Sequence, residues 1–281
     1  MAVNFAPKTT IPDTPVPLVT WYKQWNAERI LFFVVIAVFL VYGTFRAFEN
    51  NFYSTTRVYE MATAAAQSSL FANGIVPHYL SPFYSPPIQN WFNLPFNLSP
   101  ALFLLAFPGS FRFTCYFCRR TYYRAIGSPP GCAAREVLAR SNYSGEREFP
   151  LYLQNLHRYT LYFIMVFVAF HWLHFFEGFM FSDNGRTRLG IGIGTLVIAL
   201  DTIALSGYVA SCHSFRHLIG GVVDRFSTET FRHKLWQKVS WLNQRHGFFF
   251  WFSLISVGLA DVYIRFVCTG ALPDAHILLM P

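Results

Sequence analysis

Apolar stretches alternate with polar, charged segments along the whole chain. A helix needs roughly 20 mostly apolar residues to cross the hydrocarbon core of a bilayer. By this criterion we expect five spanning helices, at about residues 30–45, 99–118, 157–176, 189–215 and 247–267. The pattern therefore predicts an all-α fold, namely a polytopic membrane protein built as a five-transmembrane-helix bundle.

The segment between the first two predicted spans has an unusual composition. Residues 61–111 contain no Asp, Glu, Lys or Arg, and residues 77–100 contain six prolines. Prolines at this density prevent a regular helix, whereas the many aromatic residues argue against a disordered linker. We interpret the segment as a Pro-rich external cap, extended or partly re-entrant. The predicted organisation is a cytoplasmic N-terminal segment (1–29), a five-helix transmembrane domain (30–268) with its cap at about 50–98, and an external C-terminal tail (269–281).

Composition and charge support this interpretation. Of the 281 residues, 53% are hydrophobic and only 13% are charged, whereas a soluble domain carries about 25% charged residues. The formal charge of +8 is therefore a topology signal rather than a nucleic-acid-binding surface, and we expect no nucleic-acid partner. Most Lys and Arg residues lie before the first span, between the second and third, and between the fourth and fifth. The positive-inside rule then predicts a cytoplasmic N-terminus and an external C-terminus. Residues 1–24 are polar and Pro-rich, which predicts no cleavable signal peptide.

Cysteine and histidine residues gather at one membrane level in this topology. The odd number of five cysteines argues against a disulfide framework. The residues expected at the cytoplasmic ends of the spans are Cys115, Cys118, Cys132, Cys212, His157, His213, His217 and His246. Mixed Cys and His ligands suit zinc or an iron–sulfur cluster, and a Rieske-type [2Fe–2S] centre uses Cys on one iron and two His on the other. We therefore expect a metal site at this level.

The residues alone leave several alternatives open. A b-type haem would take axial ligands from His157, His171, His174 or His217. A structural zinc ion would instead hold together two basic connections, between the second and third and between the fourth and fifth spans, in a membrane protein without a redox role. The simplest alternative is that the cysteines are small buried hydrophobic residues and the histidines only contact lipid headgroups. For His171 and His174, in the outer half of the third span, packing or an interhelical hydrogen bond is favoured over the binding of a second cofactor.

Charged residues inside the predicted spans are candidates for function or for pairing. Asp201 lies near the middle of the fourth span, where a carboxylate is costly and is by default a functional hypothesis. We hypothesise that it lies on a proton path. Asp261 and Arg265 are four residues apart, which predicts that they pair on one helix face. Arg112 is one turn from Cys115 and is a candidate to neutralise the charge of a cofactor.

Five blocks resemble a known family: TCYFCRRTYYR (114–124), SPPGCA (128–133), LQNLHRYTLY (153–162), SCHSFRHLIGG (211–221) and LNQRHGFFFW (242–251). From about residue 25 to 270 the chain resembles the membrane-anchor C subunit of bacterial succinate dehydrogenase (respiratory complex II), in particular the haem-less five-helix anchors of actinobacteria. The resemblance implies a multi-pass protein of the bacterial cytoplasmic membrane. It also implies partners, namely an iron–sulfur subunit and a flavoprotein subunit, with a higher oligomer of the complex left open.

The resemblance further implies electron transfer from succinate to a quinone, here menaquinone, through a Rieske-type [2Fe–2S] cluster, with haem b as the alternative cofactor. Nothing in the chain is expected to bind FAD or to oxidise succinate, so the active site for succinate lies in another subunit. By resemblance, the candidate cluster ligands are two of Cys115, Cys132 and Cys212 together with two of His157, His213 and His217. The candidate quinone-binding residues are His246, Arg245, Tyr159 and Trp241.

Overall fold

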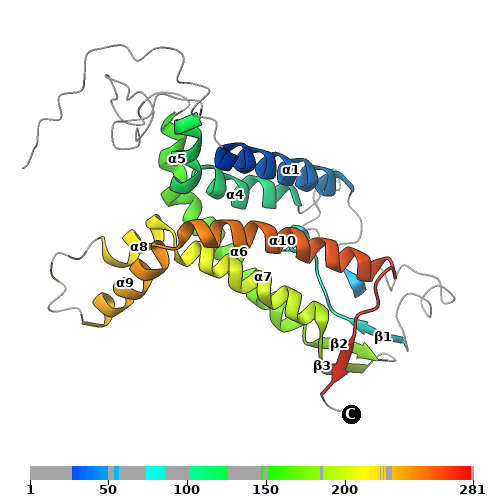
Figure 1. The fold of residues 1–281 in the computed structure, drawn as a ribbon. Helices are drawn as coiled ribbons and strands as arrows, with labels where there is room; N and C mark the ends of the chain where they lie inside the picture. Colours follow the sequence, from blue (N-terminus) through cyan, green and yellow to red (C-terminus); the bar gives the residue numbers. More distant parts are fainter. Residues whose placement is uncertain are drawn as a thin grey trace, which may run out of the picture.

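The computed structural model describes residues 27–49, 54–56, 74–85, 101–125, 147, 151–183, 186–221, 223, 225 and 230–279. Cys132, the N-terminal segment and most of the predicted cap lie outside the described residues. Five antiparallel helices form the bundle, and shorter helices gather at one end of it (Figure 1). The bundle helices are α1 (Ala27–Glu49), α4 (Ala101–Phe113), α6 (His157–Glu177), α7 (Ile193–Ala210) and α10 (His246–Cys268). The shorter helices are α5 (Tyr116–Ala125), η7 (Leu151–Leu156), α8 (His213–Gly220) and α9 (Thr230–Asn243).

Four of the predicted spans are confirmed as long apolar helices. Within the described residues, the helices of sufficient length and hydropathy cover Arg29–Glu49, Tyr152–Glu177, Ile193–Ala210 and His246–Cys268. Large apolar side chains such as Leu31, Val41 and Leu259 remain exposed on these helices. Because the bilayer itself solvates apolar side chains, such exposure is expected on the lipid-facing sides of a membrane bundle.

The prediction of one helix over about residues 99–118 was wrong. α4 ends at Phe113, the helix is interrupted at Thr114 and Cys115, and α5 then begins and turns away from α4 (Figure 1). The interruption places the backbone of Cys115 at a helix end.

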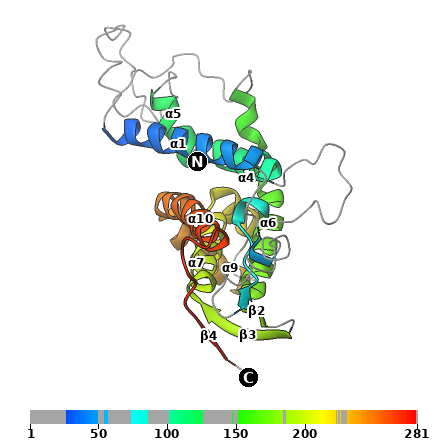
Figure 2. The same ribbon diagram turned by 90° about the vertical axis from the view of Figure 1, so that its right-hand side faces the viewer.

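The all-α prediction was also incomplete, because a small antiparallel sheet closes one end of the bundle (Figure 2). Its strands, in spatial order, are β1 (Ile75–Pro77), β2 (Met180–Asp183), β3 (Arg186–Gly192) and β4 (His276–Leu278). The predicted fourth span therefore begins as a strand, and the helix starts only at Ile193. Glycine allows this close packing, because a Cβ atom at Gly190 would lie 2.9 Å from the ring of Phe181.

The described part of the predicted cap is inserted among the helices. After β1 the chain forms a short 3-10 helix, η4 (Pro82–Tyr84), whose three residues are buried. Phe83 and Tyr84 are fully buried, and the Phe83 ring packs against Phe39 and Tyr42 of α1. Pro82, one of the six prolines of the predicted cap, is therefore itself part of the core.

The predicted Asp261–Arg265 pair is confirmed and is part of a larger buried network. Arg265 Nε donates to Asp261 Oδ2 over 2.7 Å, and one terminal nitrogen of Arg265 donates to Glu49 over 3.1 Å. The hydroxyls of Tyr42 and Ser81 also donate to the Asp261 carboxylate. The network therefore joins the ends of α1 and α10 to the inserted segment. Because lone charges are costly at this depth, such mutual pairing is what their burial requires.

The two ends of the bundle differ in chemistry. The end that carries Cys115 and Cys212, called here the cysteine end, also carries α5, α8 and α9 (Figure 1). The opposite end, called here the sheet end, carries the four strands. α1 begins at the cysteine end and α10 finishes at the sheet end, so the chain crosses the bundle an odd number of times.

Gly194 offers a test of the packing at the sheet end. A Cβ atom there would overlap the ring of Tyr79, which is buried and donates its hydroxyl hydrogen to Asp274 over 2.8 Å. We expect Gly194→Ala to lower the thermal unfolding midpoint of the detergent-solubilised protein by several degrees, because overpacking costs about 1–3 kcal/mol. The midpoint is measured by circular dichroism at the helix band.

Gly258→Ala is the matched control, because, apart from its chain neighbours and the nearby backbone of its own helix, no atom lies within 4 Å of a Cβ atom there. Replacing glycine by alanine inside a helix is favourable by up to about 1 kcal/mol, so this variant should unfold at the same temperature or slightly higher. Equal midpoints for the two variants would contradict the close packing of Tyr79 on α7.

Candidate metal centre

Four bundle helices bring their ends together at the cysteine end. α4 and α7 each finish one residue before a hydroxyl–thiol pair, Thr114–Cys115 after α4 and Ser211–Cys212 after α7. α6 and α10 each begin with a histidine, His157 and His246. Cys115 and Cys212 are 0% and 1% exposed. Two thiols and two imidazoles are therefore delivered by helix ends to one level of the bundle.

His157 is held between the two helix-ending pairs. Its Nε2 atom lies 3.0 Å from Cys212 Sγ, and its Nδ1 atom lies 3.0 Å from the hydroxyl oxygen of Thr114. The ring of Phe111 stacks on the imidazole, with 4.5 Å between ring centroids. Both ring nitrogens thus have a partner, and one face of the ring is covered by an aromatic side chain.

His246 has the same environment with the pairs exchanged. Its Nε2 atom lies 3.0 Å from Cys115 Sγ, and its Nδ1 atom lies 2.8 Å from the hydroxyl oxygen of Ser211. The ring of Tyr208 stacks on this imidazole at 5.1 Å. Each hydroxyl–thiol pair therefore presents its hydroxyl to one histidine and its thiol to the other, so that the arrangement is reciprocal.

The donor set defines what this centre can hold. Thiolate and imidazole ligands suit zinc and iron, and a hydrogen bond to the second nitrogen of a histidine orients the ring for metal binding. Among the described residues, no group of three or more His, Cys, Asp or Glu side chains surrounds a single point closely enough for one metal ion. The contacts instead form two Cys–His pairs, Cys115 with His246 and Cys212 with His157.

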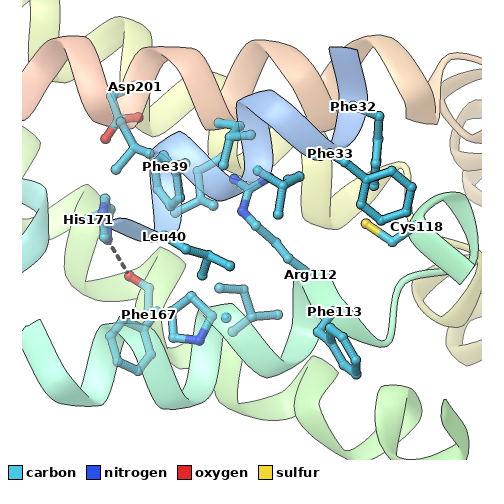
Figure 3. A pocket seen from close by; sticks show the side chains of 17 residues that line it. Phe32, Phe33, Phe39, Leu40, Arg112, Phe113, Cys118, Phe167, His171 and Asp201 are labelled. Atoms are coloured by element: carbon cyan, nitrogen blue, oxygen red, sulfur yellow. Dashed lines mark hydrogen bonds between the residues drawn. The ribbon is translucent and has the colours of Figure 1, made fainter. Parts of the chain in front are cut away.

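The structure places the other predicted ligands differently. His213 and His217 are exposed on α8, and Cys132 lies outside the described residues. The pKa of His213 is lowered by the partial burial of its ring and then by the charge of Arg216. Cys118 is buried one turn beyond Cys115, in the wall of a mostly apolar cavity of about 190 Å³ between α1, α4, α6, α7 and α10. Arg112, His171 and Asp201 line the same cavity (Figure 3). Three of the six predicted ligands, Cys115, Cys212 and His157, are therefore brought together.

The predicted quinone-binding residues are spread over two surfaces and the interior. The guanidinium of Arg245 lies 3.8 Å from the ring centroid of Trp241, and both side chains are exposed at the cysteine end. Tyr159, on α6, is 55% exposed. His246 instead faces Cys115 inside the bundle. The structure does not bring these four residues to one pocket.

The histidines proposed as alternative haem ligands lie apart from the metal centre. The Nδ1–H group of His171 donates to the carbonyl oxygen of Phe167 over 2.9 Å, and His174 Nδ1 lies 2.8 Å from a carboxylate oxygen of Glu177. Both histidines belong to the half of α6 nearer the sheet end. His217 is exposed on α8, and only His157 of the four haem candidates belongs to the metal centre.

The pairing of His246 with Cys115 was missed by the sequence reasoning. A signal existed, because a hydroxyl residue followed by cysteine ends two apolar runs, and a histidine opens two others. The chain therefore contains two copies of a helix end with Thr–Cys or Ser–Cys and two copies of a helix start with His. The two helix starts are equivalent in this pattern, which indicates His157 and His246 as the two histidines that contact the cysteines.

The chain is similar to proteins of a known family. The family model described as actinobacterial succinate dehydrogenase subunit SdhC matches residues 27–270, which include both Cys–His pairs. Among solved structures, a chain of the Mycobacterium smegmatis Sdh1 complex in the apo form shares 31% sequence identity, with a TM-score of 0.72. That match covers 99% of this chain and 98% of the other. No curated protein matches the chain.

The hydroxyl of Ser211 tests whether the reciprocal contacts serve metal binding. We expect Ser211→Ala to lower metal occupancy, because removing a hydrogen bond that orients a histidine ligand typically costs about 10–100-fold in metal affinity. Occupancy is measured by elemental analysis of the purified protein after dialysis against a chelator. Ser214→Ala is the control, since Ser214 contacts Cys212 through its backbone N–H. Equal occupancy in Ser211→Ala and the parent protein would contradict this role.

Proposed function

Because the chain belongs to the actinobacterial succinate dehydrogenase subunit SdhC family, and is thus a membrane subunit of that complex, we propose that it passes electrons to menaquinone. In this proposal the electrons come from a docked iron–sulfur subunit and cross a Rieske-type [2Fe–2S] cluster in the bundle. The observation that carries the proposal is the buried set of two thiols and two imidazoles at the cysteine end.

The proposed ligands are Cys115, Cys212, His157 and His246. Two Cys and two His are the ligand composition of a Rieske-type centre, and all four side chains come from helix ends that other contacts hold in place. Thr114 and Ser211 fix the second nitrogen of each imidazole, which leaves Nε2 directed at a thiol. When bound, the cluster would supply a one-electron carrier within the membrane. In this ligand set His246 takes the place that resemblance had assigned to His213 or His217.

The chain's own residues keep the site dry and ordered. Phe111 and Tyr208 each cover one imidazole and meet edge to face, with ring centroids 5.6 Å apart. Asn243 donates to the backbone carbonyl of Ser211 over 2.7 Å and so ties the end of α9 to the end of α7. Excluding water strengthens the interaction of any charged centre with nearby groups, since the local dielectric constant is low.

Haem and zinc fit these contacts less well. A haem between His157 and His246 would require an open space for the macrocycle, whereas each Nε2 atom already lies 3.0 Å from a sulfur. A structural zinc ion takes four ligands around one point, whereas the described contacts form two pairs. Both cofactors remain outcomes of the test given below.

The cysteine end is also the proposed docking face for the other subunits of the complex. α8 and α9 are joined there by Arg216, whose Nε donates to Ser240 over 2.8 Å, and by Arg232, whose Nε donates to the carbonyl of Ile219. Lys234 and Lys238 lie one turn apart on α9 and are exposed. We infer that this basic face is cytoplasmic, as the positive-inside rule requires, and that it contacts the iron–sulfur subunit, which in turn binds the flavoprotein subunit.

Low-temperature electron paramagnetic resonance of the reduced, purified complex tests the cluster. We expect a signal with the low average g value of mixed imidazole and thiolate ligation, and we expect His157→Ala and His246→Ala each to abolish it. His217→Ala is the matched control and should retain the signal, because His217 is exposed on α8. Zinc without iron and acid-labile sulfide, sharp haem bands on reduction, or a signal that survives both substitutions would each refute the proposed centre.

Charge reversal on α9 tests the docking face. We expect the double variant Lys234→Glu, Lys238→Glu to bind the iron–sulfur subunit about tenfold more weakly, because two lysines that complement an acidic partner surface would be replaced by charges of the same sign as that surface. The ratio of soluble subunits to membrane subunit is measured after affinity purification at two salt concentrations. Arg186→Glu, at the exposed sheet end, is the control for altered net charge. Undiminished recovery with the double variant would place the docking face elsewhere.

A further inference from the structure

The sheet at the sheet end differs from a sheet that has water on one side. An antiparallel sheet that packs one face against a core usually carries polar side chains on its other face. The inner face here is apolar, since Phe181 is fully buried and its ring stacks on His276 with 5.2 Å between ring centroids. The outer face is apolar as well, over the half of the sheet that is nearest the helices. Two apolar faces indicate that the outer face is not solvated by water.

The strand register brings the outer apolar side chains together. Ile191 on β3 pairs with Ile277 on β4, and Leu189 on β3 pairs with Met180 on β2. The backbone N–H of Leu279, just after β4, donates to the carbonyl oxygen of Leu189 over 2.8 Å. Directly paired residues, and residues two apart along a strand, lie on the same face of a sheet. These five residues, which are between 37% and 73% exposed, are called here the apolar sheet face.

The glycines of β3 fix which way this face points. Gly190 and Gly192 alternate with the exposed isoleucine and leucine. A Cβ atom at Gly190 would lie 2.9 Å from the ring of Phe181, and a Cβ atom at Gly192 would lie 2.3 Å from the hydroxyl oxygen of Tyr79. The inner side of β3 therefore has no room for a larger side chain. The strand cannot turn over to bury its apolar residues, so they must meet their partner on the outside.

The outer face of β3 changes from polar to apolar along the strand. Arg186 and Thr187 are exposed near the tip of the β2–β3 hairpin, and Arg188 Nε lies 3.1 Å from a carboxylate oxygen of Asp183. Thr187 lies on the same face as Leu189, two residues further along, which is a distance of about 7 Å in a strand. A basic, polar margin next to an apolar surface is typical of an element that lies at a membrane interface. The guanidinium of Arg186 can reach phosphate oxygens there.

The apolar sheet face continues into the lipid-facing side of α7. From Ile191 to Ile203 every exposed residue is apolar, and the others are Ile193, Leu196 and Leu200. Spacings of three and four residues place the helical members on one side of α7. Because α7 is long and apolar enough to cross a membrane, this side contacts acyl chains. No exposed polar residue separates the helix from the strand, so the same lipid can cover both.

We propose that the apolar sheet face lies in the acyl-chain region of the leaflet at the sheet end, with phospholipid as its partner, and that the hairpin tip lies at the level of the phosphates. β4 is then held at the membrane, although it belongs to the segment 269–281 that the sequence predicted as a tail outside it. The outer strands β1 and β4 can reach headgroups and water at this depth. Open sheet edges are excluded only from the hydrocarbon region itself.

Spin labelling of the whole complex in vesicles of phosphatidylcholine and phosphatidylglycerol measures the depth of this face. A nitroxide is attached to Leu189→Cys, Ile191→Cys or Ile277→Cys. Its relaxation by oxygen, which concentrates in lipid, is compared with its relaxation by a water-soluble nickel chelate. We expect all three labels to be relaxed more by oxygen, and the oxygen-to-nickel ratio to increase from position 189 to position 191.

Thr187→Cys is the matched control, because Thr187 lies on the same face of the same strand at the polar tip. Its label should be relaxed more by nickel. Labelled parent complex gives the background of the native cysteines, of which Cys115, Cys118, Cys212 and Cys268 are buried. Recovery of the soluble subunits with each variant shows that the complex has assembled.

Two results would overturn the proposal. Stronger relaxation by nickel at positions 191 and 277 would place the apolar sheet face in water. Labels that are immobilised and shielded from both reagents would show that protein covers the face, either a second copy of this chain or another subunit.

Photolabelling of the unsubstituted complex gives a result even when a variant fails to assemble. A phospholipid with a diazirine in its acyl chain should label Leu189, Ile191 or Ile277, as mapped by mass spectrometry. A phospholipid with the diazirine on its headgroup should instead label the hairpin tip. Labelling of α1, whose Leu31 and Val41 are 62% and 71% exposed, is the positive control. Acyl-chain labelling of α1 without β3 and β4 would contradict the membrane position of the sheet.

Discussion

The reciprocal contacts between two thiols, two imidazoles and two hydroxyls tie together the ends of four helices, and the cysteine end is organised around them. α4 and α7 each end just before a cysteine whose thiol contacts a histidine, Cys115 with His246 and Cys212 with His157. His157 and His246 are the first residues of α6 and α10. Since a bilayer offers no water to satisfy stray polar groups, this mutual satisfaction is a condition for burying the ends at all.

At the sheet end, buried polar groups are also paired with one another, but the groups are charged side chains rather than thiols and imidazoles. Asp261 accepts from Arg265, Tyr42 and Ser81, and Glu49 accepts from Arg265, so α1, α10 and the inserted segment share one network. The short sheet pairs the backbone groups of four segments that are not helical, β1 to β4. Asp274 adds a link to the start of α7, because its carboxylate accepts from the backbone N–H of Gly194 over 2.9 Å. At each end, hydrogen bonds between polar side chains connect different helices. The helices between the two ends are held together mainly by apolar packing.

The proposed electron path follows from this division. The metal centre lies at the end that carries the basic helices, and the cavity lies next to it in the apolar middle, with Tyr208 and Arg112 between them. In the proposed function, docked subunits would reach the metal centre from the side of the basic helices. The proposed function would thus connect a water-soluble electron donor to a membrane-soluble acceptor within one bundle.

Hydropathy alone located four of the spans, because the thickness of the bilayer sets the number of apolar residues that a helix needs to cross it. The blocks around Cys115, His157 and Cys212 likewise identified the family and three of the four residues in the Cys–His pairs. The interruption after Phe113, the strand before Ile193 and the insertion of Phe83 were not predictable in this way, since each depends on contacts between segments far apart in the chain.

The choice of His246 over His213 and His217 shows the same limit on a smaller scale. The sequence places all three histidines near the same membrane face. Their spacing along the chain does not indicate which of them contacts a cysteine. Only the tertiary structure turned His246 inward onto Cys115 and Ser211 and left the other two on the surface of α8. Sequence therefore determined which ligands are available at this level, and packing decided which of them meet, because distances between helix ends depend on how whole helices pack.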